Sequence, residues 1–307
     1  MSLDDLPDWL PAWCVDQLGD KPVGVLFALQ QMSAVFGLRL AGGRDVVVKA
    51  REDDGRAASC VAAQARLAER GFPCARPLTP AVGVGALVVH AEESRPGGEL
   101  LGGDSPDVAV RYAAVFARLM AELADVAIAP PLPNPRWVRW DHSDTGIWPP
   151  IRELDDWDQS AVPAYVVDTA ERVRRRMLAA DLPCVLGHAD FEAQNLRWHD
   201  GDVWAVHDWD SLAWQPEAAL AGAACGAFAS ASPPTLVPVE SSAAFLAAYQ
   251  ELRGRRFSAE EQEVAWAASL WPAAHNARWE AVHDWDTRVC GDAVRAQAAE
   301  RLRRANA

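Results

Sequence analysis

The fold of this chain is indicated most strongly by the stretch LGHADFEAQNLRWHDGDVWAVHDWD, Leu186 to Asp210. A short apolar run leads into a polar loop that contains Asp190 and Asn195, and a second apolar run, VWAV, leads into Asp208. The turn His199–Asp202 joins the strands, and a hairpin of this kind would bring the loop and Asp208 to the same end. Two carboxylates and one amide oxygen would then converge on one point.

Convergent oxygen ligands of this type suit Mg²⁺, whose octahedron would be completed by nucleotide phosphates and water. Phosphoryl transfer requires a metal that neutralises charge, a positioned hydroxyl and a cation on the phosphates. We expect Asp190 to orient the acceptor hydroxyl and take its proton, and Asn195 and Asp208 to hold the metal. Lys49, at the end of the run VVVK, would supply the cation.

The first ninety residues are typical of strands with one helix. A glycine turn at Gly42 and Gly43 separates two apolar runs and favours a hairpin. The alanine-rich segment from Arg56 to Arg70 predicts a helix that ends before Gly71. The predicted strands are Val23–Gln30, Ser33–Ala41, Asp45–Ala50 and Gly83–His90.

Beyond a polar linker at Glu92–Glu99 the pattern changes to helices. Apolar residues recur every three or four positions in Pro106–Val126 and Val162–Ala180, and alanine-rich helices fill the chain from Pro216 onward. Other predicted features are a loop rich in Pro and Trp at Ala129–Pro150, in which Trp137, Trp140 and Trp148 shape a pocket, and two short β runs around Cys184–Gly187 and Trp204–His207.

The loop HADFEAQN resembles the HGDxHxxN loop of the aminoglycoside phosphotransferases, which are relatives of protein kinases. VHDWD is similar to the metal-binding segment of that family, and its distance from Asn195 also fits. The resemblance covers about residues 20 to 290. It implies an α+β, bilobal protein-kinase-like fold. The small β-rich lobe would span residues 1–94, with a hinge near 88–94, and the larger, mainly helical lobe would span 95–307.

The chain departs from the family pattern at several positions. Ala189 stands where the loop usually has glycine, and Glu192 stands where it usually has a second histidine. The helix after Lys49 lacks a clear glutamate partner for that lysine. Gln64 is one polar substitute, and Glu69 or Glu52 is an alternative.

The resemblance also implies a nucleotide site between the lobes, for ATP or GTP. The turn Gln30–Ser33 would cover the phosphates, with Ser33 as the contact, although it is not glycine-rich. The hinge would offer backbone groups of Val89, His90 and Ala91 to the base. We expect His188 to hold the catalytic loop rather than to move protons. For Asp210 we favour a helix cap over the alternative of a neighbour of the metal.

A second copy of VHDWD occurs at Val282–Asp286, without a paired loop before it, so we do not interpret it as a metal site. One interpretation is an amphipathic helix with its acids outward. The alternative is a substrate wall, because in the family acids of the C-terminal helices hold a cationic substrate. Its acids would be Glu280, Asp284 and Asp286.

The formal net charge of −14 disfavours nucleic acid and anionic lipid as partners. The six cysteines are scattered, without metal-binding spacing, and predict free thiols. The N-terminal residues lack the basic flank and apolar run of a signal peptide, and no segment has about 18 uninterrupted apolar residues. These features predict a cytoplasmic protein without a membrane segment.

The sequence therefore predicts a Mg²⁺-dependent kinase that transfers the γ-phosphoryl group of ATP or GTP to a hydroxyl of an aminoglycoside-like or other cationic antibiotic. Two alternatives remain open. One is a kinase of a metabolite such as an amino sugar or a choline-like amine, and the other is a catalytically inactive nucleotide-binding pseudokinase. The oligomeric state is not indicated by the sequence.

Overall fold

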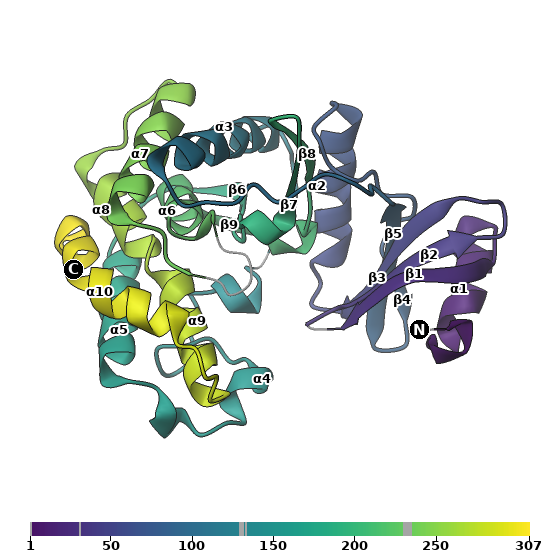
Figure 1. Ribbon diagram of the computed structural model, residues 1–307, viewed down its shortest axis with the longest axis horizontal. Helices are drawn as coiled ribbons and strands as arrows, with labels where there is room; N and C mark the ends of the chain where they lie inside the picture. Colours follow the sequence, from purple (N-terminus) through teal and green to yellow (C-terminus); the bar gives the residue numbers. More distant parts are fainter. Residues whose placement is uncertain (1, 31, 129–131, 133, 230–234) are drawn as a thin grey trace. The chain divides into compact units, whose positions relative to one another are not determined.

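The computed structural model describes residues 2–30, 32–128, 132, 134–229 and 235–307. The chain forms two compact units. The first comprises residues 1–98, 127–130 and 204–210, and the second comprises residues 99–126, 131–203 and 211–307. The first unit is built on a sheet and the second is mainly helical, which confirms the predicted α+β class (Figure 1).

A five-stranded antiparallel sheet in the order β1-β2-β3-β5-β4 forms the centre of the first unit. Lys49 on β3 lies directly opposite His90 on β5 in the register. The strand bounds are β1 Pro22–Gln30, β2 Ala34–Leu40, β3 Asp45–Glu52, β4 Val82–Val84 and β5 Leu87–Glu93. The run that was predicted as one strand, Gly83–His90, is thus divided between β4 and β5, because the chain turns at Gly85, whose φ is 61°.

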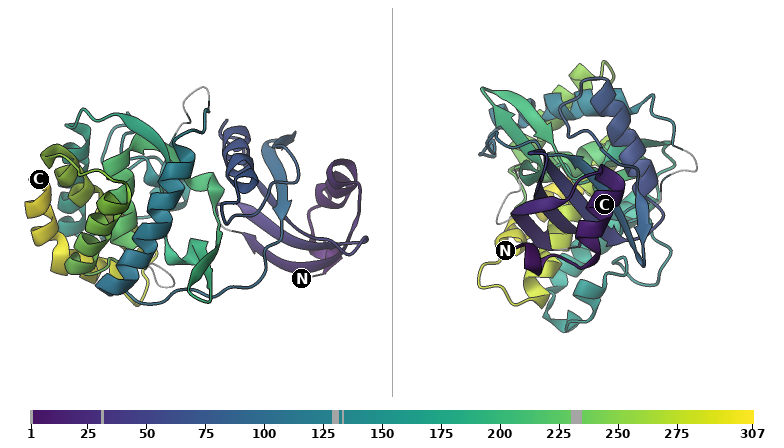
Figure 2. Two further views of the ribbon diagram at one scale, coloured as in Figure 1. Left: turned by 90° about the horizontal axis from the view of Figure 1, so that it is seen from above. Right: turned by 90° about the vertical axis from the view of Figure 1, so that its right-hand side faces the viewer.

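Helix α1 (Trp9–Leu18) packs against this sheet (Figures 1 and 2). Leu10 and Trp13 are buried in one cluster with Leu38 and Val48 of the sheet. The helix ends at Gly19, which adopts a left-handed conformation with φ of 71°. Removing these apolar side chains from water is the main stabilising contribution to this unit.

Helix α2 (Ala57–Glu69) follows the predicted segment closely and buries Gln64 and Leu67 among its inward-facing residues. The helix is followed by Gly71, whose φ of 77° only glycine adopts readily. The segment Trp204–Asp210 belongs to the same unit, where the Val206 N–H donates to the Pro73 carbonyl over 2.8 Å. Trp209 packs edge-on against Phe72, with ring centroids 6.0 Å apart.

The second unit consists mostly of helices around an aromatic core. Ser105 caps the first of them, because its side chain accepts the Val108 N–H. Phe116 lies at the centre, with ring centroids 4.9 Å from Phe191 and 5.6 Å from Tyr249. The helix bounds are α3 Pro106–Leu123, α4 Arg152–Asp155, α5 Ala164–Leu178, α6 Glu217–Ala227, α7 Val239–Leu252, α8 Ala259–Ala268, α9 Trp271–Val282 and α10 Val289–Ala305.

Short strands carry the predicted loop. β6 (Cys184–His188) pairs with β9 (Leu212–Pro216), whereas β7 (Leu196–His199) and β8 (Asp202–Val206) form a separate two-stranded sheet. The turn at His199–Asp202 therefore joins β7 to β8, and β6 does not pair with the run Trp204–His207 as its predicted partner. The physical reason is that Ser211 accepts the Ala189 N–H, which aligns β9 with β6.

Part of the loop predicted at Ala129–Pro150 lies outside the described residues, namely 129–131 and 133. All six cysteines are unpaired, as predicted, and Cys184 alone among them is exposed.

Candidate functional site

Lys49 forms a buried ion pair with Glu92 of strand β5 in the first unit. The distance from Lys49 Nζ to Glu92 Oε1 is 3.1 Å, and the two side chains are only 11% and 4% exposed. Gln64 Nε2 of α2 donates to Glu92 Oε2 over 2.8 Å and to the Ala75 carbonyl over 2.8 Å. The acidic partner of Lys49 is thus Glu92 rather than Glu52 or Glu69, and Gln64 acts by holding that carboxylate.

The electrostatics of this pair keep both groups charged. Burial alone would lower the pKa of Lys49, but Glu92, Asp210 and Asp208 outweigh it and hold that pKa above its ordinary value. Burial alone would raise the pKa of Glu92, but Lys49 and the hydrogen bond from Gln64 hold it below its ordinary value. The lysine is therefore a fixed cation over the physiological pH range.

Asp210 forms a second buried ion pair, with Arg51. Arg51 Nη1 lies 3.4 Å from Asp210 Oδ2, and Arg56 Nη1 donates to the Asp210 carbonyl over 3.0 Å. Burial would raise the pKa of Asp210, but Arg51 and Lys49 hold it below its ordinary value. The predicted role of Asp210 as a helix cap is wrong, since its carboxylate pairs with an arginine on β3 instead.

Asp208 has a left-handed backbone conformation, with φ of 59°. Asp and Asn tolerate this region better than most residues with a β-carbon, because their short polar side chains bond locally. The carboxylate of Asp208 contributes, after those of Glu92 and Asp210, to holding the pKa of Lys49 above its ordinary value. The structure therefore brings the predicted metal ligand Asp208 and the predicted phosphate-binding Lys49 together within the first unit.

The predicted catalytic loop of the second unit is held by its own polar groups. Asn195 Nδ2 donates to the Asp190 carbonyl over 2.9 Å and to Asp190 Oδ2 over 3.2 Å. The Asp190 N–H donates to His188 Nδ1 over 3.3 Å, and His188 is fully buried. Glu192, in place of the family's histidine, accepts a hydrogen bond from Gln194 over 2.8 Å. The loop thus fixes Asp190 and Asn195 side by side, with His188 in the expected structural role.

The predicted nucleotide contacts occupy two different settings. Ser33 lies at the bend before β2, and Gln31 of the same predicted turn lies outside the described residues. Val89, His90 and Ala91 are buried inside β5. The Ala91 N–H donates to Thr79 Oγ1 over 2.9 Å, and the Ala91 carbonyl accepts from Leu78 over 2.8 Å. The backbone N–H and carbonyl of Ala91 thus already have hydrogen-bond partners within the first unit, which leaves neither group available to a nucleotide base.

The three acids predicted as a substrate wall also differ in setting. Glu280 is 1% exposed, and its two carboxylate oxygens accept the N–H groups of Cys290 over 2.7 Å and Gly291 over 2.9 Å, at the start of α10. Asp284 is exposed and pairs with Arg288 over 2.9 Å, and Asp286 is exposed. Glu280 therefore anchors the start of α10, whereas Asp284 and Asp286 lie exposed between α9 and α10.

Each of the two predicted metal ligands carries an oxygen donor of the type that suits a hard divalent cation. Asp208 contributes a carboxylate and Asn195 an amide oxygen, both of the oxygen type that Mg²⁺ prefers. Across the described residues, no group of three or more His, Cys, Asp or Glu side chains could hold a metal ion. Asp208 belongs to the first unit and Asn195 to the second.

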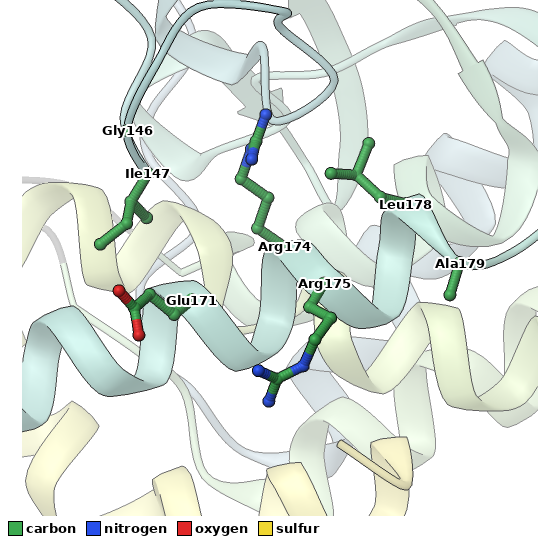
Figure 3. A pocket seen from close by; sticks show the side chains of 7 residues that line it. All are labelled: Gly146, Ile147, Glu171, Arg174, Arg175, Leu178 and Ala179. Carbon is green, nitrogen blue, oxygen red and sulfur yellow. The ribbon is translucent and has the colours of Figure 1, made fainter.

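An open cavity of about 550 Å³ lies on α5 and the loop before α4. Figure 3 shows Arg174 and Arg175 pointing in different directions from the helix, with Glu171 on the preceding turn. Arg174 donates to the carbonyls of Trp140 over 2.8 Å and His142 over 2.6 Å, so it secures the loop. None of the predicted site residues lines this cavity.

Sequence reasoning missed Glu92 and Arg51. Glu92 was assigned to a linker, and Arg51 was not singled out. A signal was available in the alternation of β3, because Lys49 and Arg51 are two residues apart and therefore share one face of the strand.

Comparison with known proteins gives one family and one fold. The sequence profile of the phosphotransferase enzyme family matches residues 30–254. No curated protein matches the sequence. No helix in the described part of the chain has both the length and the apolar character needed to cross a membrane.

Three solved structures that are similar to this chain are described as kinases or phosphotransferases, and each has a low sequence identity to it. Amicoumacin kinase hAmiN in complex with AMP-PNP, Ca²⁺ and Ami has a TM-score of 0.61 at 13% identity, covering 92% of this chain and 88% of that one. Spectinomycin phosphotransferase in complex with ADP and spectinomycin has a TM-score of 0.54 at 10% sequence identity, and the match covers 97% of this chain and 94% of that one. A choline/ethanolamine kinase family protein from Mesorhizobium loti has a TM-score of 0.56 at 16% sequence identity, and the match covers 97% of this chain and 93% of that one.

Proposed function

The chain belongs to the phosphotransferase enzyme family, and on this basis we propose that it transfers the γ-phosphoryl group of ATP or GTP to a hydroxyl of a small molecule. The observation that supports this most is the buried Lys49–Glu92 pair with Asp208 beside it. Phosphoryl transfer requires a cation that binds the phosphates and a carboxylate that can hold their metal ion. Lys49 and Asp208 are residues of these two kinds.

In this proposal Lys49 binds the nucleotide phosphates, and Glu92 keeps the lysine charged and directed. Asn195 and Asp208 hold Mg²⁺, which when bound neutralises negative charge on the phosphates. Because Ala91 is engaged inside the sheet, backbone groups that follow β5, from Ser94 onward, bind the base.

Asp190 orients the acceptor hydroxyl and receives its proton as the oxygen attacks in line. Its carboxylate is positioned by Asn195, whose amide nitrogen donates to Asp190 Oδ2 over 3.2 Å. Fixing the accepting carboxylate before the substrate arrives removes orientational freedom that would otherwise slow the step.

For the acceptor we propose a hydroxyl of an aminoglycoside-like or other cationic antibiotic, which the similarity to amicoumacin kinase and spectinomycin phosphotransferase supports. The second candidate is an amine-bearing metabolite, which the similarity to a choline/ethanolamine kinase family protein supports. A pseudokinase is disfavoured, because Lys49, Asp190, Asn195 and Asp208 are all present.

A nucleotide-consumption screen with Mg²⁺ tests the proposal across aminoglycosides, peptide antibiotics, macrolides, amino sugars and choline-like amines. We expect one class to stimulate consumption of ATP or GTP, with a phosphorylated product detectable by mass spectrometry. Nucleotide binding without consumption for every class would favour the pseudokinase instead.

A further inference from the structure

Strand β3 carries two buried cations, and each forms an ion pair with a different carboxylate. Lys49 and Arg51 are two residues apart, so their side chains leave the strand on the same face. Lys49 pairs with Glu92 of the same sheet. Arg51 Nη1 instead lies 3.4 Å from Asp210 Oδ2, and these two side chains are each 9% exposed. The second ion pair therefore links the strand of the lysine to the segment that contains Asp208.

Asp210 is held by its backbone as well as by its side chain. Its carbonyl oxygen accepts a hydrogen bond from Arg56 Nη1 over 3.0 Å, and Arg56 is only 1% exposed. Arg56 directly precedes the first residue of α2. A residue of the sheet, Arg51, and a residue at the start of the helix thus both bind Asp210, and all three belong to the first unit.

The chain is also held on the other side of Asp208. The Val206 N–H donates to the Pro73 carbonyl over 2.8 Å, and Trp209 Nε1 donates to the Val206 carbonyl over 3.0 Å. The Trp209 ring is 1% exposed and packs edge-on against Phe72. Residues on both sides of Asp208 thus have fixed positions within the first unit.

Asp208 itself has the left-handed backbone conformation, with φ of 59°. A residue with a β-carbon adopts this region rarely, and it stays there only where the surrounding structure holds it. The contacts of its neighbours provide that constraint. The direction in which the Asp208 carboxylate points therefore depends on what holds Val206, Trp209 and Asp210.

A buried ion pair is a poor source of stability, because the loss of hydration of both charges offsets most of their attraction. The best documented use of such pairs is to specify one arrangement of the parts that they join. Here the pair joins β3 to the segment of Asp208. It also matches the charge of Asp210, which favours Asp208 over Asp210 as the ligand of a further cation.

We propose that Arg51 and Arg56 are positioning residues that act through Asp210. They hold the carboxylate of Asp208 in the orientation that binds the metal ion of the nucleotide complex. Strand β3 then determines the positions of both the cation for the phosphates, Lys49, and the carboxylate for the metal. This inference rests on the proposed function, in which Asp208 holds Mg²⁺.

The first test removes the ion pair without changing the net charge. The double variant Arg51→Met with Asp210→Leu replaces both charges by apolar side chains, a change that buried pairs commonly tolerate. Calorimetry measures the binding of AMP-PNP or GMP-PNP, whichever the wild type binds, in Mg²⁺ and in EDTA. We expect the affinity to fall about tenfold in Mg²⁺ and to change by less than about twofold in EDTA. An equal change under both conditions overturns the proposal, because a merely structural ion pair would not distinguish them.

The matched control is Arg39→Met with Asp45→Leu, which removes an exposed ion pair between β2 and β3 by the same two substitutions. We expect this variant to bind nucleotide as the wild type does under both conditions. Arg51→Lys keeps a cation beside Asp210 and should retain most of the Mg²⁺-dependent affinity. A loss in Arg51→Lys as large as in the double variant would overturn the assignment to the ion pair.

Urea unfolding followed by tryptophan fluorescence shows whether the double variant folds. If it does not, Arg51→Gln is measured in its place. This substitution removes one cation, so electrostatic attraction alone would strengthen the binding of Mg²⁺ to the remaining carboxylates. Positioning predicts the opposite sign, namely a smaller gain in nucleotide affinity on adding Mg²⁺. An equal or larger gain in Arg51→Gln overturns the proposal.

Asp208→Asn separates this inference from the proposed function. A loss specific to Mg²⁺ in Asp208→Asn but not in the double variant rejects the positioning role and keeps the metal role of Asp208. No loss specific to Mg²⁺ in Asp208→Asn rejects the metal role itself, and the positioning role with it. A loss specific to Mg²⁺ in both variants supports both.

Discussion

Replacing Glu92 with glutamine removes the charge that compensates Lys49. At an effective dielectric constant of about 20, charges 3.1 Å apart attract by roughly 5 kcal/mol. Losing one partner of a buried pair typically costs about 3–5 kcal/mol. Asp208 and Asp210 still act on Lys49, and the new amide can still accept a hydrogen bond. We therefore expect Glu92→Gln to lower the free energy of unfolding by about 2–3 kcal/mol.

The pH dependence of this difference follows from the two pKa shifts. The pKa of Glu92 is held below its ordinary 4.5, so its stabilising effect is present above pH 4.5 and is lost as the pH falls through the folded-state pKa. The pKa of Lys49 is held above its ordinary 10.5, so its effect is present below pH 10.5 and is lost as the pH rises through the folded-state pKa. The difference should be flat between these limits and shrink below pH 4.5.

Urea unfolding followed by tryptophan fluorescence measures the stability, and nucleotide turnover measures the catalytic effect. We expect kcat/KM for the nucleotide to fall roughly 10- to 100-fold, which is about 1.4–2.8 kcal/mol of transition-state stabilisation. Glu52→Gln is the matched control, because Glu52 is exposed at the end of the same strand as Lys49. Equal stability and equal kcat/KM in the two variants would refute the reasoning.

Three further substitutions test other parts of the account. Asp208→Asn keeps a residue type that tolerates a φ of 59° but removes the negative charge. We expect calorimetry to show about tenfold weaker nucleotide binding in the presence of Mg²⁺ and unchanged binding in EDTA. An equal loss of affinity under both conditions would contradict a role in metal binding. Glu280→Gln should lower the free energy of unfolding by about 1–2 kcal/mol at unchanged kcat, because Glu280 accepts hydrogen bonds from two N–H groups at the start of α10. A higher KM for the acceptor without a loss of stability would instead indicate that Glu280 contacts the substrate. Gly222→Ala would press a β-carbon against the Ala265 carbonyl oxygen, so we expect urea unfolding to show a free energy of unfolding lower by about 2 kcal/mol or more. Gly83→Ala is the control and should cause no such loss, because no heavy atom lies within 4 Å of the added β-carbon.

Much of the fold could be predicted from local patterns. The glycine turn at Gly42 and Gly43 and the apolar runs beside it correspond to β2 and β3. The three- and four-residue spacing predicted α3, which begins at Pro106 as expected. These elements are recognisable because their signals lie within a few residues of chain.

Helix α1 could not be predicted in the same way. Pro11 interrupts the segment and argues against a helix. In the structure it occupies the first turn, where a backbone N–H has no partner within the helix, so the proline costs no hydrogen bond.

In the candidate site, too, the contacts between residues close in the sequence could be predicted, whereas the contacts that depend on strand pairing or helix packing could not. Asp190 and Asn195 lie in one short loop, and their hydrogen bond is a local feature that the spacing indicates. Glu92 becomes the partner of Lys49 only through strand pairing, because Val47 lies opposite Glu92 in the register and Lys49 is the diagonal neighbour on the same face. The engagement of Glu280 at the start of α10 likewise depends on packing between helices.

The central claim is that Asp190 accepts the proton of the substrate hydroxyl. The most direct measurement compares kcat and nucleotide affinity in Asp190→Asn, using Asp200→Asn in the exposed turn as the control. The account predicts that kcat falls by roughly 10²–10⁴-fold in Asp190→Asn while the dissociation constant of the nucleotide is unchanged, and that Asp200→Asn behaves as the wild type. Wild-type turnover in purified Asp190→Asn would contradict it.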